Sequence, residues 1–244
     1  MNYEVLASKV ESWIKQKNEE AKTNGVVIGI SGGVDAAVCA GLVARALGPE
    51  KVTGVLIQTT GNKEEFVGGK LICEAFGIEP IVIDLQETYK SLMNALPSST
   101  PVIEGGLRDR IRSATLYYIA NLKNQIVVST VNKNEYMLGY FCKNGSGMAD
   151  IMPIADIYKS DIWNLGIHIG VPDEIIKKIP TGDFWPGQVD EDLIGVPYDE
   201  QDTILKSIES NGVVDETNDY YIKLLNMYNR SHHKRQLIQR CTIY

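Results

Sequence analysis

Short apolar segments rich in β-branched residues alternate with segments of helical length along the first half of this 244-residue chain. An amphipathic helix is predicted over roughly the first twenty residues, where apolar side chains recur at helical spacing. This alternation predicts an α/β fold, a doubly wound parallel sheet flanked by helices. The predicted strands are Val26–Ser31, Val52–Gln58, Ile81–Asp84 and Ile126–Thr130, and the predicted helices between them are Ala36–Leu47, Lys63–Phe76, Gln86–Ala95 and Leu107–Leu122.

The second half of the chain carries more loop signals than strand signals. Proline, glycine and polar residues predict loops at 97–101, 143–150 and 179–187. The sequence becomes helical again from Tyr198, and Asp215 or Thr217 is the candidate cap of a last helix that runs toward Tyr244. The length fits one domain over residues 1–244, with a C-terminal helical segment over about 198–244.

The first predicted strand ends in the turn Ser31-Gly-Gly-Val-Asp35, and a helix follows. Backbone N–H groups converge on an anion at such a strand-to-helix turn, and glycines let a phosphate approach closely. An aspartate there supplies a hard oxygen ligand for the Mg²⁺ that accompanies a nucleotide triphosphate. An ordinary strand-to-helix turn is the alternative interpretation, because pairs of glycines are common. The sequence does not offer a Walker-type loop as another phosphate site. Its one Gly-Lys pair, Gly69-Lys70, is followed by Leu71 rather than Ser or Thr.

Composition excludes several classes of protein. A net charge of −7 argues against a general nucleic-acid-binding surface. No segment approaches the apolar length of a transmembrane helix, and the N-terminal residues lack the pattern of a secretory signal. We therefore expect a cytoplasmic protein with no nucleic-acid or membrane partner. Its cysteines are far apart and are predicted to be free thiols in a reducing compartment: Cys39, Cys73, Cys142 and Cys241.

The Ser31–Asp35 turn resembles the pyrophosphate loop of the ATP pyrophosphatases, with Ala36 where that family has a second serine. Further motifs follow in order. Together with the turn they resemble ammonia-dependent NAD synthetase, a member of the same group, over nearly the whole chain. The motifs are Ser129-Thr-Val-Asn-Lys-Asn-Glu135, Gly139-Tyr-Phe-Cys-Lys143, the run from Ala149 to Lys159, the run from Thr181 to Asp192, and His233-Lys-Arg235.

The resemblance implies a Rossmann-like sheet of the adenine nucleotide α-hydrolase type and a two-step amidation. In the first step the nicotinate carboxylate of deamido-NAD attacks the α-phosphorus of ATP, which gives an adenylate and pyrophosphate. Ammonia then attacks the activated carbonyl, and AMP leaves. Such chemistry needs alignment and charge neutralisation more than a protein nucleophile. The resemblance also implies a homodimer with the dinucleotide near the subunit interface.

The same resemblance assigns residues to ATP and Mg²⁺. Asp35 and Glu135 correspond to the metal ligands, and Asp35 and Lys159 to the catalytic groups. Taken alone, either carboxylate would be expected to be solvated or to cap a helix, and Lys159 to lie on the surface, so the ordered motif set carries these assignments. The expected ATP contacts are Gly29, Ile30, Ser31, Gly32, Gly33, Val34, Asp35, Ala36, Thr130, Lys159 and Thr181.

A second set of residues corresponds to the site for the deamido-dinucleotide. Two departures matter here, because Gly105-Gly106 replaces the Glu-Asn pair that begins the family's arginine helix, and a terminal His-Lys-Arg run is also typical of a basic helix end. The sequence leaves open whether Trp185 covers a ligand or anchors a loop. Tyr117 and Tyr118 are expected in the core or at a subunit interface, and His168 in a structural role. The expected acceptor contacts are Arg110, Lys143, Asp150, His233 and Lys234.

Two alternatives to the synthetase interpretation remain at this point. Another adenylating ATP pyrophosphatase would act on a different acceptor. A weakly active nucleotide-binding homologue would bind ATP without releasing AMP, an idea motivated by Ala36 and by Gly105-Gly106. In the leading interpretation the nitrogen donor is free ammonia, because the chain shows no sequence of a glutaminase, and glutamine alone should not support turnover.

Overall fold

The computed structural model describes residues 1–59, 61, 63–182, 185, 187–210, 212, 215, 217–238, 240 and 241. Its sheet has four parallel strands: β1 (Val26–Gly29), β2 (Val52–Gln58), β3 (Pro80–Asp84) and β4 (Ile126–Val128). The helices in chain order are α1 (Tyr3–Ala21), α2 (Val34–Leu47), η1 (Pro49–Lys51), α3 (Lys63–Phe76), α4 (Gln86–Ala95), α5 (Pro101–Lys123), α6 (Lys133–Leu138), α7 (Lys159–Ile169), α8 (Asp173–Ile176), α9 (Asp190–Ile194), α10 (Tyr198–Glu209), α11 (Asp219–Arg230) and η2 (His232–Lys234).

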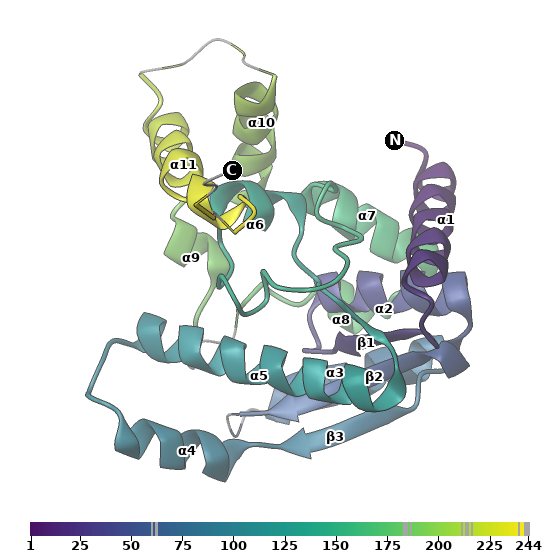
Figure 1. The fold of residues 1–244 in the computed structure, drawn as a ribbon. Helices are drawn as coiled ribbons and strands as arrows, with labels where there is room; N and C mark the ends of the chain where they lie inside the picture. Colours follow the sequence, from purple (N-terminus) through teal and green to yellow (C-terminus); the bar gives the residue numbers. More distant parts are fainter. Residues whose placement is uncertain are drawn as a thin grey trace.

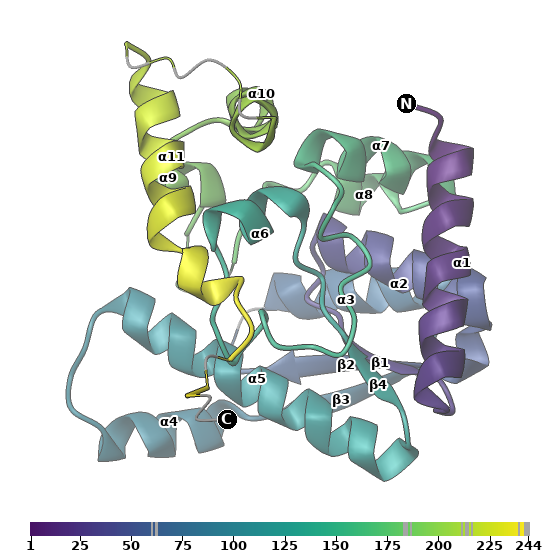
Figure 2. The same ribbon diagram turned by 45° about the horizontal axis from the view of Figure 1, so that its top comes forward.

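The strand order β3-β2-β1-β4 confirms the doubly wound sheet (Figures 1 and 2; β4 is labelled in Figure 2). The chain builds outward from β1 to β3 and then returns to place β4 on the other side of β1. The winding direction therefore changes between β1 and β4. In sheets of this kind a crevice for ligands forms at that switch point, beyond the carboxyl ends of the two strands.

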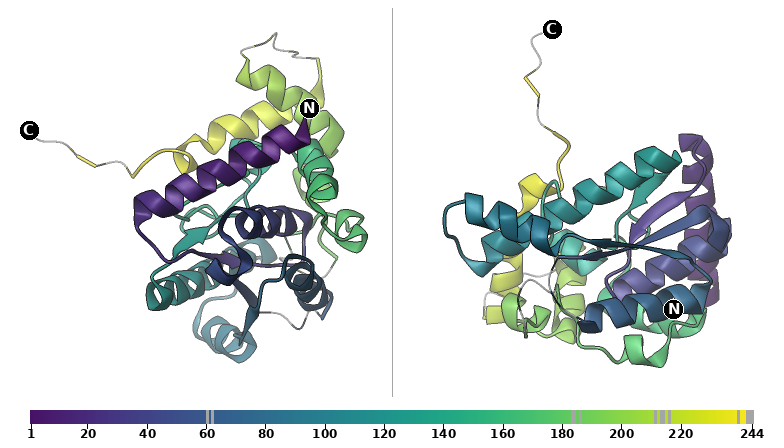
Figure 3. Two further views of the ribbon diagram at one scale, coloured as in Figure 1. Left: turned by 90° about the vertical axis from the view of Figure 1, so that its right-hand side faces the viewer. Right: turned by 90° about the horizontal axis from the view of Figure 1, so that it is seen from below.

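Alternate side chains of the strands enter two different cores. Val26 and Ile28 of β1 face the larger core, which they share with α1, α2, α7 and α8. Val27 of β1 and Val127 of β4 face the other side of the sheet, where Leu116 and Ala120 of α5 cover them. Figure 3 shows the two helical layers on opposite faces of the sheet. Because β1 and β4 are buried on both faces of the sheet, their apolar residues form continuous segments instead of alternating with polar residues.

A third apolar cluster lies away from the sheet, among the helices of the second half of the chain. Leu138 of α6, Leu205 of α10 and Leu224 of α11 are buried together there. These helices gather beyond the ends to which the strands point (Figures 1 and 2). The predicted return to helix at Tyr198 is confirmed, since α10 begins at that residue.

Several predicted boundaries were wrong, for identifiable reasons. Helix α5 begins at Pro101 rather than Leu107, because Thr100 caps it and proline fits the first helical position. The last helix is capped by Asn218, whose side chain accepts from the backbone of Tyr221, and it ends at Arg230. Neither Asp215 nor Thr217 caps it, because the Asp215 carboxylate accepts from the backbone and hydroxyl of Thr217 instead. The prediction that this helix runs toward Tyr244 was therefore too long, and residues 242–244 lie outside the described residues.

Candidate active site

The Ser31–Asp35 turn lies at the switch point of the sheet, between β1 and the N-terminus of α2. Gly32 has a φ of +80°, and a Cβ there would lie 2.6 Å from the backbone oxygen of Glu65 in α3. Only glycine satisfies both constraints. The first turn of α2, from Val34 to Ala36, leaves N–H groups with no acceptor inside the helix. The turn therefore has the geometry of an anion site at a helix N-terminus.

Three charged side chains meet beside this turn. Asp35 lies in the first turn of α2, Glu135 in the first turn of α6, and Lys159 begins α7. The Lys159 ammonium is paired with Oδ2 of Asp35, and the Lys159 side chain is 1% exposed. The structure thus brings together the two predicted metal ligands and the predicted catalytic lysine, which the sequence separates widely. Burial of Lys159 also excludes the surface role that its sequence context would suggest.

Electrostatic coupling inside this cluster is strong. Desolvation by the surrounding protein, followed by the charge of Asp35, raises the pKa of Glu135 to about 8. Burial opposes the charged form of Lys159, but the carboxylates of Asp35 and Glu135 outweigh it and raise the pKa of the lysine. With Glu135 protonated, the charges of Asp35 and Lys159 balance, whereas ionisation of Glu135 adds a negative charge that a further cation would neutralise. Among the described residues, no group of three His, Cys, Asp or Glu side chains is arranged to hold a metal ion.

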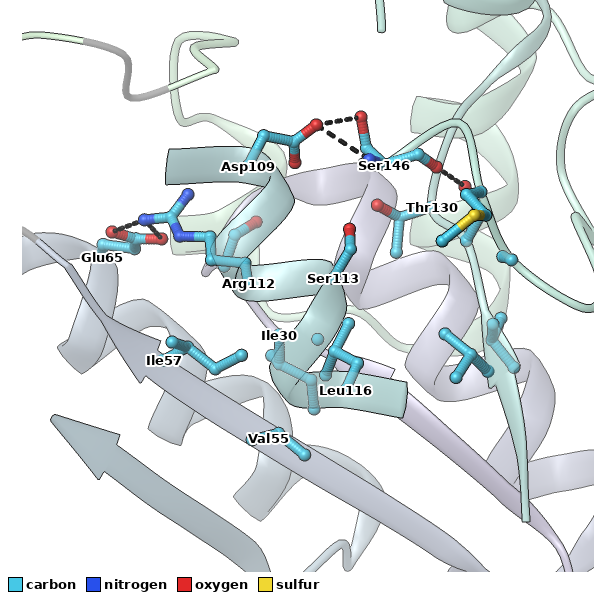
Figure 4. Close-up of a pocket in the computed structure, with 17 residues that line it drawn as sticks. Ile30, Val55, Ile57, Glu65, Asp109, Arg112, Ser113, Leu116, Thr130 and Ser146 are labelled. Carbon is cyan, nitrogen blue, oxygen red and sulfur yellow. Dashed lines mark hydrogen bonds and ion pairs between the residues drawn. The ribbon is translucent and has the colours of Figure 1, made fainter. Parts of the chain in front are cut away.

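A cavity of about 130 Å³ opens beside the cluster, between α5 and the carboxyl ends of β1, β2 and β4 (Figure 4). Its floor is apolar, with Val55, Ile57 and Leu116, and its mouth carries the ion pair between Glu65 and Arg112. A concave site with an apolar floor and a few polar groups at its edge suits a small aromatic ring system. Four of the predicted ATP contacts line it: Gly29, Ile30, Ser31 and Thr130.

The loop that carries Thr181 is tied to the same region through a buried carboxylate that the sequence analysis did not assign. Asp190 is 4% exposed and accepts hydrogen bonds from the Tyr140 hydroxyl, the Gly182 backbone and the Gln188 amide at 3.0, 3.0 and 2.8 Å. Gln188 in turn accepts from the hydroxyl of Thr181 at 3.2 Å. The network joins the predicted ATP side of the site to the loop that carries Lys143. Three residues of the predicted motif, Asp183, Phe184 and Pro186, lie outside the described residues.

Comparison with known proteins identifies the family. The model of the family described as NAD synthase matches residues 6–238. This chain belongs to the NAD synthase family. It is 37% identical over 239 residues to the NH₃-dependent NAD⁺ synthetase of Archaeoglobus fulgidus, covering 97% of this chain and 96% of that one.

Two solved structures support the assignment of the fold. The NMN synthetase of Francisella tularensis superimposes with a TM-score of 0.89 at 31% identity, over 100% of both chains. The NH₃-dependent NAD synthetase of Campylobacter jejuni gives a TM-score of 0.86 at 28% identity, over 99% of this chain and 100% of that one. The expected Rossmann-like α/β architecture and the membership of the ligase family are therefore confirmed. No helix in the described part of the chain is long and apolar enough to cross a membrane.

The residues expected to bind the acceptor fall into one group and one outlier. Arg110 donates to the backbone oxygen of Lys143, and the Lys143 ammonium donates to that of His233. The Lys234 ammonium donates to the backbone oxygens of Gly139 and Phe141, in the turn that follows α6. Three cations, Arg110, Lys143 and Lys234, therefore surround the 139–147 loop beside His233, although both lysine ammonium groups already bind carbonyl oxygens of the chain.

Asp150 is the outlier. Its carboxylate accepts from the backbone N–H of Val127 at 2.7 Å, and its backbone N–H donates to the Val127 carbonyl. Asp150 thus covers the open edge of β4, a place where an unpaired strand would otherwise expose its backbone. The predicted contact between Asp150 and the acceptor remains a prediction, and the position of Asp150 at this edge does not by itself support it.

The helices α6 and α7, which position Glu135 and Lys159, were not predicted from the sequence. A signal for α6 was present, because Asn132-Lys-Asn-Glu135 has the spacing of a capping box, and both reciprocal bonds of that box form. Gly105-Gly106, the departure that put the start of the arginine helix in doubt, lies inside α5 and does not interrupt it. Ala36 is buried in the first turn of α2, and the helix begins at Val34 with alanine at this position.

Proposed function

We propose that this protein converts deamido-NAD to NAD with ATP and free ammonia, and releases AMP and pyrophosphate. The observation that carries the proposal is the meeting of Asp35, Glu135 and Lys159 beside a glycine turn at the switch point of the sheet. The names of the relatives support the same reaction. No Ser-His-Asp nucleophile is needed, because the acceptor's own carboxylate attacks phosphorus.

The residues around the turn would bind ATP in two parts. The base would enter the cavity over Val55 and Ile57, and the phosphates would lie against the backbone N–H groups of Gly32, Gly33 and the first turn of α2. Lys159 would then place its ammonium beside the α-phosphate, where negative charge develops as pyrophosphate leaves. Thr130 and Thr181 would contact the nucleotide from the two flanking loops.

Asp35 and Glu135 fit a magnesium ion. Both offer carboxylate oxygens, the donors that Mg²⁺ prefers, and two protein carboxylates are the usual number when phosphates and waters complete the shell. Once Glu135 loses its proton to a bound cation, the two carboxylates carry one more charge than the Lys159 ammonium balances. When bound, Mg²⁺ neutralises charge on the triphosphate and on the leaving pyrophosphate. We assign both residues as its ligands and Asp35 and Lys159 as the catalytic groups.

The cations around the 139–147 loop would hold the anionic acceptor. Arg110, Lys143 and Lys234 form a local positive patch beside His233, on a chain whose net charge is −7. Such a patch binds a phosphorylated acceptor despite the overall field. Binding requires that Lys143 and Lys234 exchange a carbonyl partner for a phosphate oxygen, since each forms hydrogen bonds to the backbone.

One observation favours a second acceptor. The Francisella tularensis structure at 31% identity and a TM-score of 0.89 carries the name NMN synthetase. A mononucleotide with a free carboxylate is therefore the alternative substrate for the same chemistry. The two acceptors share the reacting carboxylate and differ by one adenylate group.

We further propose that residues 1–244 act as one domain, that the protein works in the cytoplasm, and that two copies associate. Helix α5 exposes apolar side chains near both of its ends, with Ile103, Tyr118 and Leu122 63%, 64% and 67% exposed. Exposed apolar side chains that gather on one face mark sites of protein association. Tyr118 was expected in the core or at a subunit interface, and its exposure favours the interface.

The deciding experiment supplies ATP, Mg²⁺ and ammonium together with either deamido-NAD or the mononucleotide at equal concentration. The proposal expects NAD, AMP and pyrophosphate in equal amounts and a higher kcat/KM for deamido-NAD. A higher kcat/KM for the mononucleotide would establish the second candidate. Formation of ADP instead of AMP would contradict both, and efficient use of glutamine without ammonium would contradict the proposed nitrogen donor.

A further inference from the structure

We propose that two buried asparagines at the start of α6, Asn132 and Asn134, are positioning residues that hold the reacting groups of this site in register. Asn132 fixes the carboxylates of Asp35 and Glu135 relative to each other, and Asn134 fixes the origin of Lys159. The inference rests on the proposed function, because it concerns the groups that would carry out that reaction.

Asn132 is 0% exposed, and three of its own polar groups form hydrogen bonds with Asp35 and Glu135. Its amide Nδ2 donates to Oδ1 of Asp35 at 3.0 Å, and its Oδ1 accepts from the backbone N–H of Glu135 at 3.0 Å. Its backbone N–H donates to Oε2 of Glu135 at 2.9 Å. The partners dictate the orientation of the amide, because a carboxylate only accepts and a backbone N–H only donates.

The choice of asparagine at this position follows from the two bonds of its side chain. Serine or threonine would cap α6 as well, but neither offers an amide donor that spans the gap to Asp35. An aspartate would cap the helix and place a second negative charge against Asp35. Asparagine combines a cap with a donor, and it thereby links the first turn of α6 to the first turn of α2.

Asn134 positions the backbone of Lys159. Its side chain is 1% exposed, and its Oδ1 accepts from the backbone N–H of Lys159 at 3.0 Å. Its Nδ2 donates to Oδ1 of Asp202 in α10 at 2.7 Å. Asp202 also accepts from the backbone N–H of Ser160 at 3.2 Å. The beginning of α7 is therefore fixed against both α6 and α10, and the buried stem of Lys159 starts from a defined point.

The two asparagines should have different signatures, because only one of them touches the proposed metal ligands. Asn132→Ser keeps the helix cap and removes the donor to Asp35. We expect kcat to fall on the order of 10- to 100-fold, with the KM for the acceptor within about twofold of wild type. Asn134→Ala removes the anchor of Lys159 and should lower kcat similarly, but it should leave metal binding unchanged.

The readout beyond turnover is Mn²⁺ binding, measured by electron paramagnetic resonance in the presence of ATP without acceptor or ammonium. We expect Asn132→Ser to weaken Mn²⁺ binding on the order of tenfold, and Asn134→Ala to match wild type within about twofold. Asn132→Thr is a second cap-preserving variant, should the serine variant fold poorly. The matched control is Asn218→Ser, since Asn218 caps α11 through a 3.1 Å bond to the Tyr221 backbone, away from the site.

Wild-type Mn²⁺ binding and kcat in a folded Asn132→Ser or Asn132→Thr variant would overturn the role of Asn132. Wild-type kcat in Asn134→Ala would overturn that of Asn134. An equal loss in Asn218→Ser would show that capping alone explains the effect at Asn132, and would overturn its role. If the wild-type protein forms no NAD or NMN, the proposed function fails, whereas the Mn²⁺ comparison still decides whether Asn132 positions the carboxylates.

Discussion

Lys159 is a charged side chain that is almost completely buried, and a carboxylate and two aromatic rings surround its ammonium. Its ammonium is paired with Asp35 and lies 5.5 and 5.3 Å from the rings of Trp163 and Tyr198. A buried charge is stable only when it is paired in this way. In the metal-free protein the lysine therefore occupies a place beside Asp35 that a magnesium ion would share. Metal and lysine should compete until phosphates offer the lysine another partner.

We predict that Lys159→Met lowers kcat on the order of 10²- to 10³-fold, because it removes a cation from the developing charge. The same variant should bind Mn²⁺ more tightly than wild type when no ATP is present, since Asp35 loses its competing partner. Titration of Mn²⁺ followed by electron paramagnetic resonance measures this. Lys177→Met, which removes an exposed lysine paired with Asp173, is the matched control. Weaker Mn²⁺ binding in Lys159→Met would contradict the competition.

Glu135 gives a prediction about pH. Because its folded-state pKa is raised from 4.5 to about 8, the folded metal-free protein keeps a proton that the unfolded chain loses. The unfolded state then binds fewer protons, so the stability contributed by this group is complete below about pH 4.5 and is lost as the pH rises through about 8. Glu135→Gln should therefore unfold at a higher temperature than wild type at pH 8, and the difference should shrink toward pH 5.

The measurement is thermal unfolding of both proteins without metal from pH 5 to pH 8.5. Glu19→Gln, on the exposed side of α1, removes the same charge elsewhere and serves as the control. Glu135→Gln should also lower turnover on the order of 10²- to 10³-fold while the protein stays folded. An identical melting temperature for Glu135→Gln and wild type at pH 8 would show that Glu135 is ionised in the metal-free site.

At the scale of elements, α6 connects the reaction centre to the C-terminal segment. Its N-terminus carries Glu135, and its C-terminus ends at Gly139, which has a φ of +64°. Arg235 donates to the Met137 and Tyr228 carbonyls at 2.6 Å each, so one guanidinium binds the C-terminal ends of α6 and α11. A cation at a helix C-terminus is favourable because of the unpaired carbonyls there. The basic segment at 233–235 thus stabilises the helix that presents Glu135.

A pair of glycines tests this contact. A Cβ at Gly139 would collide with the Cβ of Ser231, whereas one at Gly170, which ends α7 with a φ of +86°, would meet nothing within 4 Å. Gly170→Ala should cost about 1 kcal/mol from the left-handed backbone alone. Gly139→Ala should cost about 2 kcal/mol more, because the C-terminal segment must move. Chemical denaturation measures both, and equal costs would contradict the close packing of Ser231 on α6.

At the scale of the whole molecule, α5 lies on the face of the sheet opposite α1 and α7 (Figure 3). Ile103, Tyr118 and Leu122 of this helix are exposed, and Leu237, beyond η2, is 90% exposed. An interface on the helix that also carries Arg110 would place the acceptor site beside a second copy. Association and substrate binding are therefore expected to be linked.

We predict that Ile103→Asp combined with Tyr118→Asp converts a dimer to a monomer and raises the KM for the acceptor. A charge at each position would have to be buried in the interface without a partner. Sedimentation velocity measures the change. Ile167→Asp is the control, because Ile167 is 62% exposed on α7, away from α5. A wild-type protein that is monomeric at micromolar concentration would contradict the proposed association.

Local periodicity determined much of the fold. The bounds of β2, α3 and α4 were predicted to the residue, since each is a regular segment bounded by turn-forming residues. The Ser31–Asp35 turn and the order of the later motifs were also sufficient to identify the family. The helices α6 and α7 were missed because they are short or lie among loop signals, so that packing rather than periodicity stabilises them.

Only the tertiary structure decided how the charged groups meet. The pair between Lys159 and Asp35 spans 124 residues, and the bond from Asn132 to Asp35 spans 97. Contacts between residues so far apart leave no periodic pattern in a sequence, because they depend on which helix N-termini the sheet brings to its switch point. The sequence alone therefore determined the sheet, the phosphate turn and the residue types of the site. The burial of Lys159, the raised pKa of Glu135 and the bonds of Asn132 and Asn134 arise from packing around that switch point.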